Sequence, residues 1–89
     1  MTERRVWKYP LGLSVEPWVR MPVGAEVVHV AEQGGQPTLW AIVDSSQPMV
    51  RRLIHVVGTG DAVPDGTAYV GTAHLGGYVL HVFDGGDQE

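Results

Sequence analysis

Glycine and proline recur at short intervals along the whole chain, and this spacing constrains the fold more than any other feature. Twelve Gly and six Pro are spread over 89 residues, so few stretches are long enough for an amphipathic helix. The segments between them are rich in Val, Thr, Trp, Tyr and Ile, which favour strands. We therefore expect an all-β protein with no substantial helix.

Apolar segments alternate with turn residues, and this alternation predicts about seven short strands. The expected strands are 5–9, 16–21, 25–33, 37–43, 50–57, 67–74 and 78–83. Strands of this length and spacing indicate a small antiparallel sandwich or a partly open barrel. The length predicts a single domain over 1–89, with an ordered body over 6–83 and an acidic tail over 84–89.

The turns give the most local predictions. Gly34-Gly35 and Gly76-Gly77 each lie between two apolar segments, and paired glycines accept the positive φ values of a two-residue hairpin turn. The third and fourth strands, and the sixth and seventh, should therefore pair. The prolines at 10, 17 and 22 cannot donate to a ladder, so the first two strands should be edge strands or irregular.

The segment 39–43 is apolar on both faces of its expected strand. Trp40 and Ile42 share one face, and Leu39, Ala41 and Val43 share the other. A strand of this kind is covered on both sides. We expect the second cover to be a partner subunit or the N-terminal segment. A domain this small is marginal alone, which also favours a homo-oligomer.

Composition excludes several classes of protein. Without cysteine the chain has no disulfide framework and no thiolate zinc site. Its apolar runs are too short to span a membrane and its first residues do not form a secretory signal, so we expect a cytoplasmic protein. The net charge is −4 and no basic stripe is present, which makes duplex nucleic acid an improbable partner.

Three histidines lie in apolar strand contexts at equal spacing. His29, His55 and His81 are 26 residues apart. They indicate histidines on a polar or interfacial sheet face, a three-histidine metal site, or an ancestral hairpin repeat. In a meander, alternate strands lie about 9–10 Å apart, so one metal ion would require the rings to converge from a closed barrel or another strand order. We favour the first interpretation and predict no metal or other cofactor.

The segment Gly58-Thr59-Gly60 leaves a strand as phosphate-binding loops do. Successive backbone N–H groups there could hold an anion, with Thr59 as donor and Arg51 or Arg52 as charge partner. Neither a following helix nor a lysine at the required position is present, so this is not a P-loop. The alternative interpretation is an ordinary long hairpin loop.

The large aromatic residues are candidates for core, interface or base stacking. The chain has seven of them, Trp7, Tyr9, Trp18, Trp40, Tyr69, Tyr78 and Phe83, and the candidates for an interface or for stacking are Trp7, Tyr9, Trp18 and Trp40. Aromatic side chains dominate small cores and interfaces, and they also stack on bases. No Ser-His-Asp spacing and no carboxylate pair in an apolar context supports catalysis, so we expect a protein that is not an enzyme.

Several sequence blocks together resemble a family of small proteins that is common in phage genomes and in bacteria carrying phage genes. The blocks are Trp7-Lys8-Tyr9-Pro10-Leu11, Met21-Pro22-Val23-Gly24-Ala25, Leu39-Trp40-Ala41-Ile42-Val43-Asp44, Gly58-Thr59-Gly60, Tyr69-Val70-Gly71-Thr72 and Val79-Leu80-His81-Val82-Phe83. The resemblance covers about 6–83 and brings no catalytic residues with it. It implies a phage accessory protein in the host cytoplasm.

Two functions follow as hypotheses. One is a counter-defence protein that binds and sequesters a small anionic nucleotide signal of the host. The other is a protein-interaction or structural assembly module that binds itself or a host protein.

Overall fold

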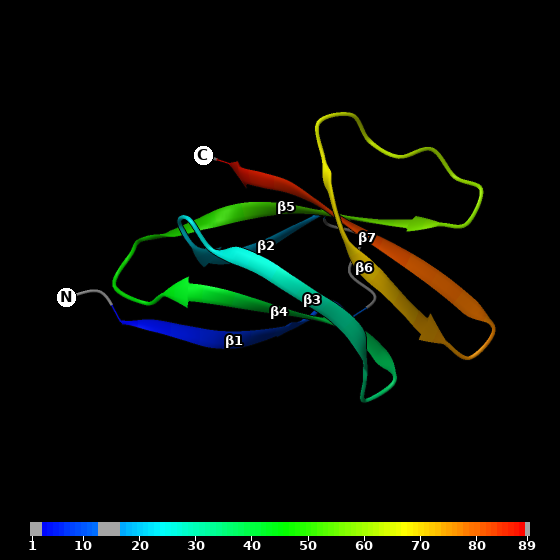
Figure 1. The fold of residues 1–89 in the computed structure, drawn as a ribbon, viewed down its shortest axis with the longest axis horizontal. Helices are drawn as coiled ribbons and strands as arrows, with labels where there is room; N and C mark the ends of the chain where they lie inside the picture. Colours follow the sequence, from blue (N-terminus) through cyan, green and yellow to red (C-terminus); the bar gives the residue numbers. More distant parts are fainter. Residues whose placement is uncertain (1–2, 13–16, 89) are drawn as a thin grey trace.

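The computed structural model describes residues 3–12 and 17–88, which fold into two layers of antiparallel strands (Figure 1). The strands are β1 (Arg4–Pro10), β2 (Trp18–Pro22), β3 (Glu26–Gln33), β4 (Gln36–Asp44), β5 (Met49–Gly58), β6 (Ala68–Leu75) and β7 (Tyr78–Gln88). Within these two ranges no helix forms, and none of their segments is a helix long and apolar enough to cross a membrane. The expected all-β class with seven strands is confirmed.

The strands form a three-stranded and a four-stranded sheet. Sheet A has the order β1-β4-β3, and sheet B has the order β2-β5-β7-β6. All pairings are antiparallel, and the sheets do not close into a barrel. The result is an open sandwich with extents of 44 × 29 × 19 Å.

Local turn chemistry explains the pairings that the sequence predicts. Gly34 and Gly35 have φ values of 63° and 81°, and they join β3 to β4. Leu75 faces Tyr78 across the second two-residue turn, which joins β6 to β7. The strands β1 and β2 lie at the edges of sheets A and B, as their prolines require.

The core lies between the sheets, and β4 contributes one of its faces. Leu39, Ala41 and Val43 are buried there, whereas Trp40 and Ile42 lie half-buried on the outer face of sheet A. The expectation that the N-terminal segment folds over this outer face is wrong. That segment instead forms β1, which hydrogen-bonds to the edge of β4 and extends the sheet sideways.

The strand β7 is longer than predicted. The sequence indicates an end at Phe83 and an acidic tail, but β7 continues to Gln88 and pairs with β5 through Asp87 and Gln88. A bulge at Gly85 makes this possible, because a Cβ atom there would lie 2.9 Å from Cδ2 of Leu53. Asp84 and Asp87 of the expected tail belong to the strand because they accept hydrogen bonds from the buried guanidinium of Arg52, which is described below.

The edge strands β3 and β6 belong to different sheets and lie close together. A Cβ atom on Gly71 of β6 would lie 2.8 Å from Cγ1 of Val30 on β3. The small residue allows the two backbones to approach. This contact draws the layers together along one side of the sandwich.

Candidate functional site

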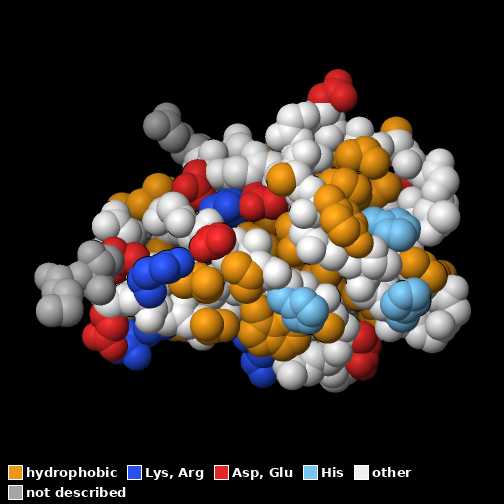
Figure 2. Space-filling model, viewed as in Figure 1, with side chains coloured by type: hydrophobic (Ala, Val, Ile, Leu, Met, Phe, Trp, Pro, Cys, Tyr) orange, Lys and Arg blue, Asp and Glu red, His pale blue; other side chains and the backbone are white. Residues whose placement is uncertain are grey.

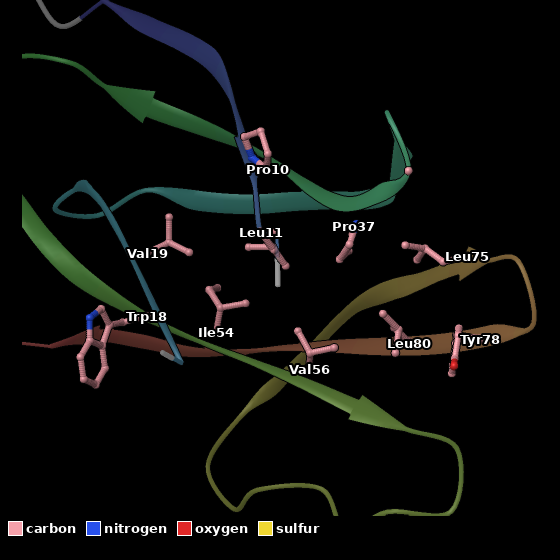
Figure 3. Close-up of a pocket in the computed structure, with 12 residues that line it drawn as sticks. Pro10, Leu11, Trp18, Val19, Pro37, Ile54, Val56, Leu75, Tyr78 and Leu80 are labelled. Atoms are coloured by element: carbon pink, nitrogen blue, oxygen red, sulfur yellow. The ribbon is translucent and has the colours of Figure 1, made fainter. Parts of the chain in front are cut away.

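An apolar cavity of about 570 Å³ lies between the two sheets. Side chains from both layers point into a common space (Figure 3). The lining residues are Pro10, Leu11, Gly12, Trp18, Val19, Gly35, Pro37, Ile54, Val56, Leu75, Tyr78 and Leu80. Of these, Tyr78 is the residue with an ionisable side chain, and the ring of Trp18 lies at the rim, turned away from the other lining side chains (Figure 3). The cavity therefore suits an apolar ligand that needs few hydrogen bonds.

Strand alternation brings these side chains together. On β5, Ile54 and Val56 point inward, as do Tyr78 and Leu80 on β7, because side chains two residues apart share a face. Val56 points inward and is still 46% exposed, and Tyr78 is 74% exposed. An inward apolar residue that stays exposed marks a part of the core that is not filled. The three-stranded sheet A leaves this part of sheet B uncovered.

The opposite end of the inter-sheet space is closed by a buried arginine. Arg52 is 9% exposed, and its Nε and Nη2 donate to the two carboxylate oxygens of Asp84 at 2.8 and 2.7 Å. Its Nη1 donates to Asp87 at 3.0 Å and to the carbonyl oxygen of Ala25 at 2.6 Å. Asp87 also accepts from the backbone N–H of Gly24 at 2.9 Å. This network joins β5 and β7 to the turn between β2 and β3.

The pKa values at this end follow from the pairing. Burial alone raises the pKa of Asp84, but hydrogen bonds from Arg52 and from the backbone N–H of Gly86, with the charge of Arg52, lower it below its ordinary value. The hydrogen bond to Asp84 raises the pKa of the Arg52 guanidinium. Both groups are therefore charged, and each satisfies the other.

The predicted anion site is not assembled. Gly58 lies six residues from Arg52 along the extended strand β5, which is roughly 20 Å. Arg52 already binds two carboxylates, so it is not available to a ligand at the loop. Asp61 turns back against the backbone of Gly58, where a Cβ atom would lie 2.9 Å from its Oδ2. The N–H of Asp61 donates to the carbonyl oxygen of Gly58 at 3.1 Å, which closes an ordinary turn.

Thr59 has a different partner from the one predicted. Its hydroxyl lies 2.8 Å from Nε2 of His81, and Nδ1 of His81 lies 2.9 Å from the hydroxyl of Thr72. The hydroxyl of Thr72 is 2.6 Å from that of Tyr69. A continuous hydrogen-bonded chain thus crosses the outer face of sheet B. Thr59 and His81 were both candidate residues, but for separate sites.

The three equally spaced histidines do not converge. His29 lies on the outer face of sheet A, where its ring is 5.7 Å from that of Trp40. His55 and His81 lie on neighbouring strands of sheet B, because β5 pairs with β7. Among residues 3–12 and 17–88, no group of three His, Cys, Asp or Glu side chains could hold a metal ion. The histidines are therefore divided between the two sheets, because β3 belongs to sheet A and β5 and β7 belong to sheet B.

The four aromatic candidates occupy three environments. Trp7 and Tyr9 point inward from β1 and pack against the core. Trp18 is 39% exposed at the cavity rim, and the guanidinium carbon of Arg51 lies 5.1 Å from the centre of its ring. Trp40 lies on the outer face of sheet A with His29. The structure therefore brings Trp18 to the candidate site and places Trp7, Tyr9 and Trp40 elsewhere.

Sequence reasoning missed most of the cavity. Leu75, Leu80 and Val56 look like ordinary core residues in strands, and no local pattern shows that a core position lacks a partner.

Figure 2 shows how the basic side chains and the histidines are distributed over one face of the molecule, which composition does not reveal. Lys and Arg side chains gather in the half of the molecule that holds the chain ends, and the visible histidines lie at the centre and in the other half.

Comparisons with known proteins place the chain at the level of family. No curated protein and no solved structure matches it. A family model described as "Domain of unknown function (DUF7352)" matches residues 2–89. Because this match spans nearly the whole sequence, the chain belongs to that family.

Proposed function

We propose that this protein is a non-enzymatic ligand-binding domain, and that its ligand is a small apolar molecule held in the cavity between the sheets. The observation that carries the proposal is the cavity itself. Its volume of about 570 Å³ falls within the range of roughly 300–1,000 Å³ that small-molecule sites occupy. Its lining is dominated by apolar side chains, with the hydroxyl group of Tyr78 to orient a bound molecule.

The energetics support an apolar occupant. Val56 and Tyr78 point into the cavity and remain exposed, so a ligand would remove apolar surface from water. Each Å² of apolar surface removed contributes about 25 cal/mol. A charged ligand would gain little here, because the described residues that line the cavity include no Lys, Arg or His.

The test uses the dye Nile red, whose fluorescence rises in apolar surroundings, with Val56→Lys as the variant. An ammonium group at the cavity mouth should weaken dye binding at least tenfold, which is about 1.4 kcal/mol and within the cost of desolvating a charge. Val6→Lys is the matched control, because Val6 is 64% exposed on the outer face of sheet A. Equal binding by the two variants would remove the proposal.

Native mass spectrometry of protein purified from bacterial cytoplasm gives a second readout. A retained small molecule on the wild type that is absent from Val56→Lys supports the cavity as its site. A retained molecule on both proteins places the ligand elsewhere and contradicts the proposal. The same spectrum reports the number of subunits.

The phage setting and the capture of a host nucleotide signal stay predictions. The residues that motivated a nucleotide, Gly58–Gly60 with Arg51 and Arg52, lie apart, so we propose an apolar ligand in preference. Isothermal titration against a panel of nucleotide signals tests the earlier hypothesis, and binding that Thr59→Ala abolishes without a loss of stability would restore it.

Assembly is the second candidate function. The observation that favours it is the outer face of sheet A, where Val6 and Val28 are 64% and 44% exposed beside half-buried Trp40 and Ile42. A second copy of the chain is the proposed partner. Light scattering at high concentration tests it, and a monomeric mass would contradict self-assembly.

A further inference from the structure

The outer face of sheet B differs in chemistry from the outer face of sheet A. We define it by the outward positions of its four strands. These positions are known because Arg52, Ile54 and Val82 point inward, and side chains alternate along a strand. The outward residues that the argument uses first are Trp18 and Arg20 on β2, Arg51 and His55 on β5, Phe83 on β7 and Tyr69 on β6.

A row of rings crosses this face at right angles to the strands. His55 is directly opposite Phe83, and Phe83 is directly opposite Tyr69. The rings of Tyr69 and Phe83 lie 5.5 Å apart at an angle of 58°. Tyr69 is 60% exposed, so its ring is accessible. Three planar side chains on neighbouring strands form a surface on which other planar groups can stack.

Two arginines lie on the same face beside a further ring. Arg20 of β2 is directly opposite Arg51 of β5, and both are exposed. The guanidinium carbon of Arg51 lies over the ring of Trp18, 5.1 Å from its centre, which is a cation–π contact. Guanidinium groups bind phosphate oxygens with matched geometry. This part of the face combines stacking with phosphate recognition.

The hydrogen-bonded chain described above fixes the groups between these features. His81 contacts hydroxyl groups through both ring nitrogens, from Thr59 and from Thr72. Thr72 in turn contacts the hydroxyl of Tyr69, which limits rotation of that ring. A preorganised ring loses less conformational entropy when a partner stacks on it.

The charge of this face is opposite to that of the whole chain. No Asp or Glu occupies an outward position on the described strands of sheet B, although the net charge of the protein is −4. Sheet A differs, since Glu26 and Asp44 lie on its outer face and Arg4 forms an ion pair with Glu26 at 3.2 Å. Asp61 in the neighbouring loop turns toward Gly58.

We propose that the outer face of sheet B binds a short single-stranded nucleic acid. Bases stack on Phe83, Tyr69 and Trp18, and backbone phosphates contact Arg20 and Arg51. Three strand spacings separate β2 from β6, which is roughly 14 Å. A single strand can cross this distance, whereas paired bases in a duplex present no free faces to the rings.

The test is fluorescence anisotropy of labelled oligothymidylate and oligouridylate of about eight nucleotides, titrated with protein at low and moderate salt. We expect saturable binding that weakens as salt rises. Tyr69→Ala should weaken binding about tenfold, which is within the stacking contribution measured for single bases. Arg20→Ala should weaken binding and also reduce its dependence on salt concentration.

The controls lie on the outer face of sheet A. Val6→Ala removes a side chain as exposed as Tyr69, and Arg4→Ala removes an exposed arginine, so neither should change the affinity. Circular dichroism shows whether each variant is folded. Anisotropy that does not change at low salt, equal affinity for a duplex of the same length, or unchanged affinity in both Tyr69→Ala and Arg20→Ala would each overturn the proposal. Tyr69→Ala should bind Nile red as the wild type does, because Tyr69 does not line the cavity. The nucleic-acid proposal and the cavity proposal can therefore fail independently.

Discussion

The two ends of the space between the sheets are built on opposite principles. At one end, Arg52 is buried and donates to Asp84, Asp87 and the carbonyl oxygen of Ala25. At the other end, apolar side chains line an open cavity. The first end contains charges that are fully paired, and the second contains apolar groups that lack neighbours. Polar networks stabilise a fold when every member has a partner. An open apolar cavity contributes less to stability, because its lining side chains are not packed against other groups.

This difference indicates that one end of the sandwich stabilises the fold and that the other end binds a ligand. Removing a residue from the paired end should damage the fold, because it leaves a buried charge without a partner. Removing a residue from the open end should damage binding and leave the fold intact. The predictions below test this contrast, beginning with the largest expected effect.

Arg52→Ala should lower the free energy of unfolding by about 3–5 kcal/mol, since Asp84 and Asp87 then remain without their cation. Urea denaturation monitored by tryptophan fluorescence measures the change. Arg4→Ala is the control, because the ion pair of Arg4 with Glu26 is 63% exposed on both sides and should contribute less than about 1 kcal/mol. Similar losses in the two variants would contradict the structural role of the buried network.

Asp84 should make stability depend on acid. Its pKa is lower in the folded protein than its ordinary value of 3.8, so its ion pair stabilises the fold above that pH. The contribution is lost as the pH falls below 3.8 and through the lowered folded pKa. Unfolding curves recorded from neutral pH downward should show this loss in the wild type. Asp84→Asn should be less stable at neutral pH and should lack that part of the acid dependence.

Tyr9→Phe should stabilise the protein by about 1 kcal/mol. Tyr9 packs between the two core clusters, and its buried hydroxyl has no hydrogen-bond partner among residues 3–12 and 17–88. The same burial raises its pKa. Removing a buried polar group that lacks a partner recovers its desolvation cost. A lower melting temperature for Tyr9→Phe would show that the hydroxyl is satisfied in solution.

Tyr78→Ala should change the free energy of unfolding by less than about 0.5 kcal/mol, as surface substitutions usually do. Tyr78 is 74% exposed at the cavity mouth, so its ring contributes little to the packed core. Nile red binding should nevertheless weaken, because the ring covers one side of the cavity. A large loss of stability with unchanged dye binding would show that Tyr78 supports the fold and does not take part in binding.

Local chemistry explains which features of the fold the sequence could predict. The two-residue turns at Gly34-Gly35 and Gly76-Gly77 and the edge positions of β1 and β2 depend on a few neighbouring residues. The assignment of residues 39–43 to two faces was also correct, because alternation of side chains is a property of any strand. These features need no knowledge of which strands pair across the molecule.

Long-range pairing explains what the sequence could not predict. Arg52 was one of two candidate charge partners for an anion at the glycine loop, but the bulge at Gly85 brings Asp84 and Asp87 beside it. His55 and His81 lie on neighbouring strands because β5 pairs with β7, whereas His29 lies on the other sheet. A side chain's position in the sequence gives its face of a strand, but the strand order decides what lies opposite.

The sequence by itself determined the all-β class, the hairpin turns and the inner face of β4, since glycine, proline and strand alternation act over a few residues. The tertiary structure alone decided the buried ion network, the apolar cavity and the ring-bearing face of sheet B. Each of these arises from residues that are far apart in sequence, and the packing of three strands against four brings them together or leaves them uncovered.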